Sequence, residues 1–190
     1  MNATEQILKN ELHLSDEMCD RFMQLTGTEY LKKKELFTGQ GKVCHHIGIV
    51  ESGVLRSYIE KDAVEYIKDF YFCGSLVVSY GSFLTGEPGI GSIQALEDTR
   101  LVTLSRPAYD LLMGESNEWL KLGKYISDTL LIRKCRRESS FLMDNAYERY
   151  KLLLKTYPHI EQHVSQHHIA AYLGIQPESL SRLKSLNIDQ

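Results

Sequence analysis

The amino-acid sequence predicts an α+β protein in which a β-rich region is followed by a long helix and a C-terminal pair of short helices. Three patterns predict this order. Short runs of β-branched and aromatic residues alternate with Gly and Asp turns over residues 28–105, a helical pattern without proline runs from Asn117 to about Leu142, and two compact helical segments meet at Gly174. A content of 43% apolar and 25% charged residues is typical of an ordinary globular chain and excludes a largely disordered one.

The first 25 residues predict two short helices. Ser15 is a natural N-cap for the second helix, in which Met18, Phe22 and Leu25 recur at spacings of four and three residues. The β-rich region that follows contains five clear runs, at 47–50, 54–59, 64–70, 92–96 and 101–104. Short strands at spacings near ten residues predict a small sandwich or barrel rather than parallel β-α-β units.

The long helix carries one apolar stripe near heptad period. Pro107 begins a shorter helix before it, and Ser116 is a candidate cap between the two. The stripe consists of Trp119, Leu122, Ile126 and Leu130. A single stripe on so long a helix belongs either to the core or to a helix–helix seam. We favour a seam with a second copy, because the helix joins two regions of different composition.

The last 26 residues carry the most specific pattern. Asn145 or Asp144 caps a helix that stops before Pro158, and two helices then span about 166–173 and 177–186. Gly174 permits the positive φ that ends the first of these, and Pro177 fits the first turn of the second. Apolar residues occupy the positions at which two helices of a helix-turn-helix face each other, while small residues allow the close crossing; these are Ile169, Ala170, Leu173, Ile175, Leu180 and Leu183.

A helix-turn-helix places its second helix in the major groove of DNA. Glu178 and Arg182 are four residues apart, so they point into the groove together, where Arg182 can donate two hydrogen bonds to guanine and Glu178 can accept from cytosine. An i,i+4 ion pair between them would hold the Arg182 side chain in place. The candidate DNA-binding residues are Ser165, Gln166, His167, Gln176, Glu178, Ser179, Ser181 and Arg182.

At this point the chain resembles the Crp/Fnr superfamily of bacterial transcription regulators. The segments Leu-Phe-Thr-Gly-Gln (36–40) and Ile-Val-Glu-Ser-Gly-Val-Leu-Arg (49–56) look like early strands of that family's cyclic-nucleotide-binding-like β-roll. Asn-Ala-Tyr-Glu-Arg (145–149) resembles the start of its DNA-binding domain, and Glu-Ser-Leu-Ser-Arg (178–182) is similar to the Fnr-type recognition helix.

The resemblance implies a double-stranded β-helix, that is, a jelly-roll-like β-roll, then a dimerisation helix and an abbreviated winged helix-turn-helix. The corresponding ranges are 1–115 for the effector-sensing domain, 116–143 for the dimerisation helix and hinge, and 144–190 for the DNA-binding domain. It also implies a homodimer, a palindromic DNA site with TTGA-like halves read by Glu178, Ser181 and Arg182, and RNA polymerase as a partner. The protein would be cytoplasmic, with no membrane association and no catalytic residues.

The sequence departs from the family's cyclic-nucleotide cassette. Ser75 stands where an acidic residue for the ribose is expected, and no arginine occurs between Arg56 and Arg100 to hold the phosphate. A buried phosphate requires a charged or bidentate donor, so we predict that cAMP is not bound in the family manner. Any effector would be another ligand, for which the candidate polar lining is Ser75, Ser79, Tyr80, Ser82, Ser92 and Gln94.

Charge and cysteine content bound the remaining alternatives. The net charge of −3 divides into −6 for residues 1–115 and +3 for residues 116–190, so the C-terminal part is the basic one. The four Cys form no Cys-x-x-Cys pair, and we expect reduced thiols, no metal and no cofactor. Haem bound through Cys44, His45 or His46, an enzyme on a β-barrel, and a sensor whose helix-turn-helix contacts proteins are less favoured readings.

Overall fold

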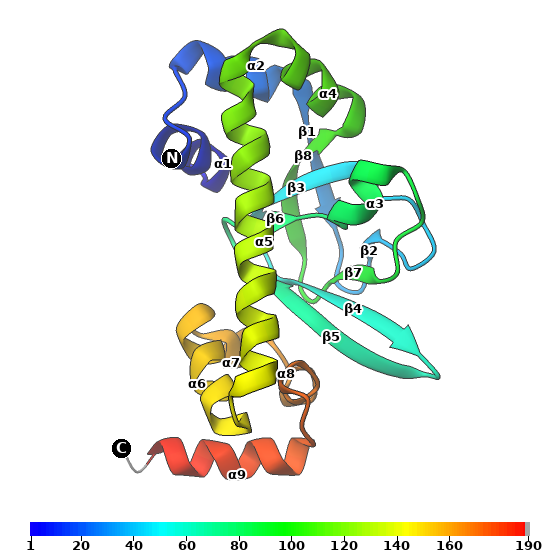
Figure 1. Ribbon diagram of the computed structural model, residues 1–190, viewed down its shortest axis with the longest axis vertical. Helices are drawn as coiled ribbons and strands as arrows, with labels where there is room; N and C mark the ends of the chain where they lie inside the picture. Colours follow the sequence, from blue (N-terminus) through cyan, green and yellow to red (C-terminus); the bar gives the residue numbers. More distant parts are fainter. Residues whose placement is uncertain (189–190) are drawn as a thin grey trace.

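Two four-stranded antiparallel sheets pack face to face over residues 26–105, and the long helix α5 (Leu120–Met143) runs along one side of them (Figure 1). The computed structural model describes the backbone of residues 1–188 and the side chains of residues 1–185. The mixture of helices and antiparallel sheets confirms the predicted α+β class.

The first sheet has the strand order β1-β8-β3-β6 and the second the order β2-β7-β4-β5. The strands of the first are β1 (Thr26–Leu31), β8 (Thr99–Ser105), β3 (His46–Ser52) and β6 (Leu76–Val77). Those of the second are β2 (Leu36–Thr38), β7 (Ser92–Ala95), β4 (Leu55–Lys61) and β5 (Val64–Tyr71). The turn from β3 to β4 requires Gly53, whose φ is 91° and whose missing Cβ would lie 2.6 Å from the Asp98 carbonyl oxygen.

Side chains from both sheets form the inner core. It consists of Leu31, Val50, Leu55, Tyr71, Val77, Ile93, Ala95 and Leu101. All five strand runs read from the sequence are strands in the structure. The sequence pattern missed three strands. These are β1, which buries only Leu31 fully and so shows no apolar alternation, β6, which is only two residues long, and β2, which only the family resemblance at 36–40 indicated.

The N-terminal helices cover one end of the first sheet. They are α1 (Ala3–Gln6), the single π-turn η1 (Ile7–Glu11) and α2 (Asp16–Leu25), and Ser15 caps α2 as predicted by accepting from the Met18 N–H at 3.3 Å. The buried carboxylate of Glu51 on β3 accepts from the backbone N–H of Ala3 at 3.1 Å and of Thr4 at 2.9 Å. These bonds satisfy two free donors of α1 and fix it to the sheet.

The chain passes from β8 to helix α5 through α4 (Arg106–Glu115) and the 3₁₀ turn η2 (Asn117–Trp119), while the short helix α3 (Tyr80–Thr85) lies between β6 and β7. The predicted seam stripe faces inward: Trp119, Leu122 and Ile126 are at most 3% exposed in the chain's own core, and Leu130 packs against it. Burial in the chain's own core therefore contradicts the predicted contact with a second copy for Trp119, Leu122 and Ile126, whereas Leu130 is only half-buried. An apolar stripe at this period looks the same whether it meets a sheet or a partner helix.

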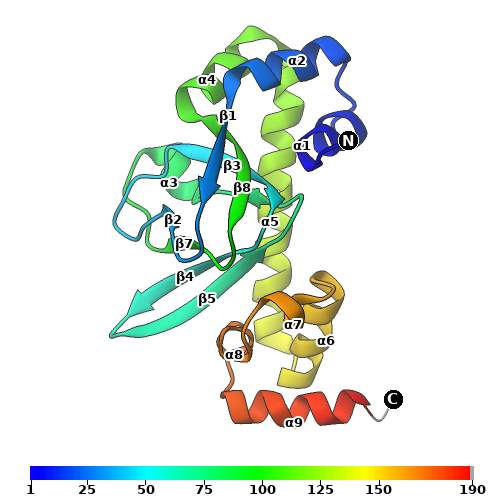
Figure 2. The same ribbon diagram turned by 180° about the vertical axis from the view of Figure 1, so that it is seen from behind.

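Four helices complete the chain at the far end of α5 (Figure 2): α6 (Ala146–Thr156), α7 (Ile160–His163), α8 (Gln166–Leu173) and α9 (Pro177–Ile188). Asn145 begins α6 with a capping box, in which its side chain accepts from the Glu148 N–H and Glu148 accepts from the Asn145 N–H. Among the described residues no helix is both long enough and apolar enough to cross a bilayer.

Candidate nucleic-acid interface and effector pocket

Helices α8 and α9 meet at the turn that the sequence predicts. Ser165 caps α8 by accepting from the His168 N–H at 3.3 Å, and Gly174 ends it with a φ of 69°. Pro177 then opens α9. The two helices fold at these points because each supplies the residue type that the local backbone requires.

The inner sides of these helices form one apolar cluster with α6 and α7. Ile169, Leu173 and Leu180 are at most 1% exposed, and they pack with Tyr150 and Leu153 of α6. Lys184 of α9 also pairs with Glu161 of α7 at 2.7 Å, and Glu161 accepts from the Tyr150 hydroxyl at 3.1 Å. Burial and this carboxylate raise the pKa of Tyr150 to about 12. Apolar packing against α6 and α8, together with the network of Lys184, Glu161 and Tyr150, therefore fixes the position of α9.

The predicted DNA-contact residues lie on the surface. Of these, Ser165, Gln166, His167, Gln176, Glu178, Ser181 and Arg182 are exposed, and Ser179 is half-buried. Glu178 and Arg182 do not form the expected ion pair within the described part of the chain, so both side chains extend freely from α9. Figure 1 shows α9 lying across the end of α5, on the side away from the sheets.

Aromatic packing docks the C-terminal helices on β5. The Phe70 ring lies 5.3 Å from the Tyr172 ring and 6.2 Å from the Tyr157 ring, measured between centroids. The Tyr157 hydroxyl donates to the carboxylate of Asp69, which also pairs with Arg133 of α5 at 3.2 Å. Burial raises the pKa of Tyr157, and the Asp69 charge raises it further. Tyr157 thus stays neutral and remains a donor.

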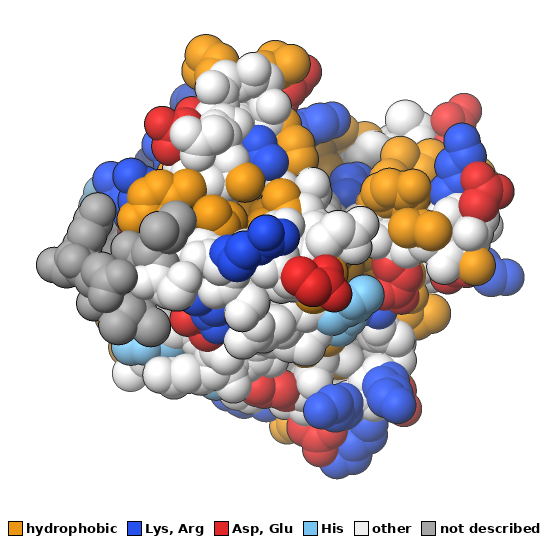
Figure 3. All heavy atoms as spheres, turned by 90° about the horizontal axis from the view of Figure 1, so that it is seen from below, with side chains coloured by type: hydrophobic (Ala, Val, Ile, Leu, Met, Phe, Trp, Pro, Cys, Tyr) orange, Lys and Arg blue, Asp and Glu red, His pale blue; other side chains and the backbone are white. Residues whose placement is uncertain are grey.

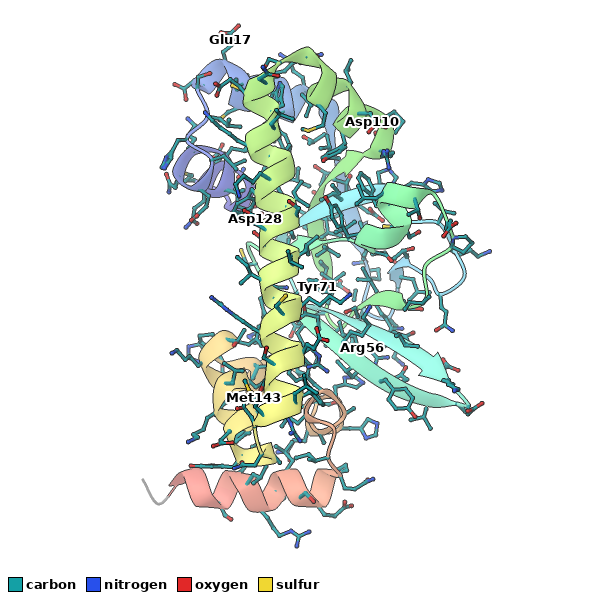
Figure 4. All side chains as sticks on the ribbon, in the orientation of Figure 1. Glu17, Arg56, Tyr71, Asp110, Asp128 and Met143 are labelled. Carbon is teal, nitrogen blue, oxygen red and sulfur yellow. The ribbon has the colours of Figure 1, made fainter. Side chains whose placement is uncertain are left out.

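A polar network lies beside this aromatic contact, on the side of the β4–β5 hairpin that faces α8 (Figure 4). Arg56 donates to Glu65 at 2.8 Å and to Gln94 at 2.8 Å, and its Nη1 lies 2.9 Å from Nε2 of His168. Burial, together with the Arg56 charge, lowers the pKa of His168 to about 4. The imidazole is therefore neutral near pH 7 and accepts from Arg56, with Nδ1 buried and unpaired in the described structure.

A pocket of about 880 Å³ opens between the sheets and α5, a size typical of small-molecule sites. Tyr71 lies at this boundary between sheet and helix (Figure 4). One wall is formed by residues 78–93 and contains no Lys or Arg. The opposite wall, from β5 and α5, contains Lys68, Arg133, Lys134 and Arg137.

Four of the six predicted lining residues border this pocket, namely Ser79, Tyr80, Ser82 and Ser92. The prediction was wrong for Ser75, whose hydroxyl closes a turn by accepting from the Phe72 N–H at 3.1 Å. It was also wrong for Gln94, whose side chain is held by Arg56 and donates to the Lys34 carbonyl. Ser82 and Ser92 accept from the backbone N–H of Cys44 and Gln40, so they shape the wall as well as facing the pocket.

Sequence reasoning did not assign the basic side chains of α5 to the pocket. The sequence shows a basic run at 133–137, Arg-Lys-Cys-Arg-Arg, but not what these side chains face. The spacing of Leu130, Arg133, Lys134 and Arg137, one helical face, was the available signal. The docking contacts had no such signal, since Asp69 and Tyr157 are 88 residues apart.

Known proteins share this architecture. Residues 28–116 match the family model described as cyclic nucleotide-binding domain, and no curated protein matches the chain. FixK2 from Bradyrhizobium japonicum is similar over 85% of this chain and 83% of its own, with a TM-score of 0.73 and 19% identity.

The c-di-GMP responsive global regulator CLP of Xanthomonas campestris covers 92% of this chain and 93% of its own, at a TM-score of 0.69 and 18% identity. A Crp/Fnr-family regulator from Eubacterium rectale covers 93% and 85%, at a TM-score of 0.69 and 19% identity. At these identities the likeness shows a common fold. The fold expected from the resemblance to the Crp/Fnr superfamily is thus confirmed, and residues 28–116 match a cyclic nucleotide-binding domain within it.

The neutral His168 predicts a pH dependence of stability. The unfolded chain takes up a proton near the ordinary pKa of 6.5, whereas the folded chain resists it until about 4. The free energy of unfolding should therefore fall as the pH decreases from 6.5 toward 4, and His168→Gln should reduce that fall. Urea denaturation across this range measures it. His167→Gln, at the exposed neighbouring histidine, is the control and should keep the wild-type slope; equal slopes for all three proteins would contradict the assignment.

Proposed function

We propose that this chain, which has the fold of the Crp/Fnr regulators, is a sequence-specific DNA-binding transcription regulator that acts as a homodimer and responds to an effector other than cAMP. One observation carries the proposal. Helix α9 buries Leu180 completely while Glu178, Ser181 and Arg182 stay exposed, as does Gln176 immediately before the helix. A helix held this way presents a polar row that fits the major groove.

The α8 helix would position the chain on the DNA backbone. Its first turn has free backbone N–H groups, and the exposed side chains of Gln166 and His167 lie beside them. The Ser165 oxygen is used as the cap, but its hydroxyl proton can still be donated to a phosphate. Phosphate contacts of this kind fix orientation, whereas the α9 side chains supply sequence discrimination.

The surface around α9 favours recognition by a few groove contacts over attraction by bulk charge. Figure 3 views this end of the molecule, where hydrophobic patches interrupt a surface of uncharged side chains and backbone, and basic and acidic groups are scattered over it. Residues 145–190 contain five Lys or Arg against four Asp or Glu. Non-specific DNA binding should therefore be weak, because it depends on neutralised phosphates.

The outer face of α5 is the surface that we propose for the dimer. Leu120, Leu131 and Leu142 are 56%, 61% and 80% exposed, and they are spaced by 11 residues, which places them along one line of the helix. Figure 1 shows α5 uncovered by other elements over its middle. A second copy packing symmetrically along this outward row would bury the three leucines, and exposed apolar rows of this kind mark such contacts.

The pocket supports an effector that is not cAMP. The wall at residues 78–93 has Glu87 and no cation, so it offers no charged donor for a cyclic phosphate. The solved relative CLP responds to a different nucleotide, c-di-GMP. A fold of this kind thus accommodates more than one effector.

Arg182→Ala should abolish sequence preference, because a bidentate arginine–guanine contact contributes about 1–3 kcal/mol of discrimination. Fluorescence anisotropy with a palindromic TTGA-like site and a scrambled duplex, across a salt series, measures it. Arg182→Lys is the matched control: it keeps the charge and the salt dependence but should lose about tenfold in discrimination. Unchanged preference in Arg182→Ala would show that α9 does not read DNA and would favour a role in protein contacts.

Leu131→Asp should dissociate the dimer, because it places a carboxylate at the centre of the outward row. Light scattering coupled to size exclusion measures the mass of each variant. The control is Leu111→Asp, which changes a leucine that is 49% exposed on another helix, α4, outside the pocket lining. A Leu131→Asp protein that keeps the dimer mass, or a wild type that is a monomer, would contradict this choice of face.

Isothermal titration of the wild-type chain with cAMP should give no micromolar binding, since the 78–93 wall lacks a cation. Ile90→Arg is the positive control. It adds to the 78–93 wall a cation that can donate to the cyclic phosphate, so it should raise the affinity for cAMP. Micromolar affinity in the wild type would overturn the exclusion of cAMP.

A further inference from the structure

The β5–α5 wall of the pocket concentrates positive charge that the protein does not neutralise. Of its four cations, Arg133 is paired with Asp69. Lys68, Lys134 and Arg137 form no ion pair with any side chain that the structure describes. Partial burial lowers the pKa of Lys68, and the charges of Lys134 and Arg137 lower it further. Three cations therefore face the same opening and repel one another.

The acids at the pocket do not balance them. Asp69 is already engaged by Arg133 and Tyr157, and Glu87 lies in the 78–93 wall. Glu138 lines the pocket without an ion pair to a described residue. Within this wall, three unpaired cations stand against one unpaired carboxylate.

Arg137 carries a more specific sign of a missing partner. Its Nη2 donates to the Ile67 carbonyl at 2.9 Å and to the Tyr172 carbonyl at 3.1 Å, and its guanidinium stacks 3.8 Å from the centroid of the Tyr172 ring. Its Nη1, in contrast, is buried and has no hydrogen-bond acceptor in the described structure. A buried donor without an acceptor is unfavourable, and an anion supplied from the pocket would satisfy it.

We propose that this pocket binds a small organic anion, a carboxylate or a phosphate monoester, whose charged group is held by Lys68, Lys134 and Arg137 on the β5–α5 wall. The apolar part of the ligand would lie against Tyr71, Ile93 and Leu130, which line the same pocket. This places the charge across the pocket from the 78–93 wall, where a cyclic nucleotide phosphate would be expected.

The same site explains how binding would reach the C-terminal helices. Arg137 connects the pocket to Ile67 of β5 and to Tyr172 of α8 at once. An anion that orders Arg137 strengthens this connection and so favours the docked position of α8 and α9. This regulatory consequence rests on the proposed function, whereas binding of the anion does not.

The test uses the full chain without DNA, in a buffer free of phosphate and carboxylate. Phenyl phosphate, benzoate and the neutral benzyl alcohol serve as probes, with inorganic phosphate to separate the charged group from its organic part. Titration calorimetry should show binding of phenyl phosphate or benzoate and none of benzyl alcohol at the same concentration. The preference between the two anions identifies the charged group, and hydrogen exchange in α8 should slow when the preferred anion binds.

Lys68→Gln and Lys134→Gln should each weaken binding of the preferred anion by about tenfold, the effect of one charge-assisted hydrogen bond. Among the described residues, neither lysine forms a side-chain hydrogen bond or ion pair, so these variants stay informative if Arg137→Gln loosens the C-terminal helices. Arg136→Gln, an exposed arginine outside the pocket lining, is the matched control and should bind as the wild type does.

Binding of benzyl alcohol as strong as that of the anions, no binding of either organic anion, or unchanged affinity in both lysine variants would each overturn the anion site. Because none of these measurements involves DNA, their failure leaves the DNA-binding proposal standing. Conversely, if the Arg182 variants showed that α9 does not read DNA, the anion site would still stand. Only its regulatory consequence would be lost.

Discussion

Much of this structure depends on strand β5 being covered on both sides. Ile67 and Phe70 are at most 2% exposed because they pack in one cluster with α6, α8 and α9, while Tyr71 is buried in the core between the sheets. Lys68 and Tyr71 also border the pocket. Strand β5 therefore lies between the pocket and most of the C-terminal helices, and Tyr172 of α8 borders the pocket itself. The Phe70 contact with Tyr157 and Tyr172 combines apolar burial with ring packing. A change in the pocket can therefore reach α8 directly at Tyr172 as well as through β5.

The positive charge of the C-terminal part lies mainly on α5 and not on the surface around α9. The basic run at 133–137 gives the C-terminal part its positive balance, yet two of its members turn inward. Arg133 pairs with Asp69, and Arg137 donates to two backbone carbonyls. These charges fix the C-terminal helices to β5 and line the pocket, so they do not add to the surface around α9. In the proposed function, discrimination then depends on the few charged side chains of α9 itself, of which Glu178 and Arg182 are exposed.

Local signals in the sequence were sufficient for the helices near the C-terminus and insufficient for everything that depends on distant contacts. Ser165, Gly174 and Pro177 define the bounds of α8 and α9 through backbone chemistry, so those elements could be predicted. The stripe containing Ile126 predicted the long helix correctly but not what the stripe packs against, which is the chain's own core. Periodicity identifies an apolar face without saying what covers it. Contacts such as Arg56 with His168, 112 residues apart, left no trace in spacing or composition.

The docked arrangement also limits how an effector can act. A ligand shifts a conformational equilibrium only by the difference between its affinities for the two states. A ligand touching only the 78–93 wall would have the same contacts whether α8 were docked or free, because no residue of that wall packs in the cluster that holds α8. Arg137 and Tyr172 are different, since both border the pocket and both belong to the docking contact. The residues through which binding can be coupled to the position of α9 are therefore those on the α5 side of the pocket.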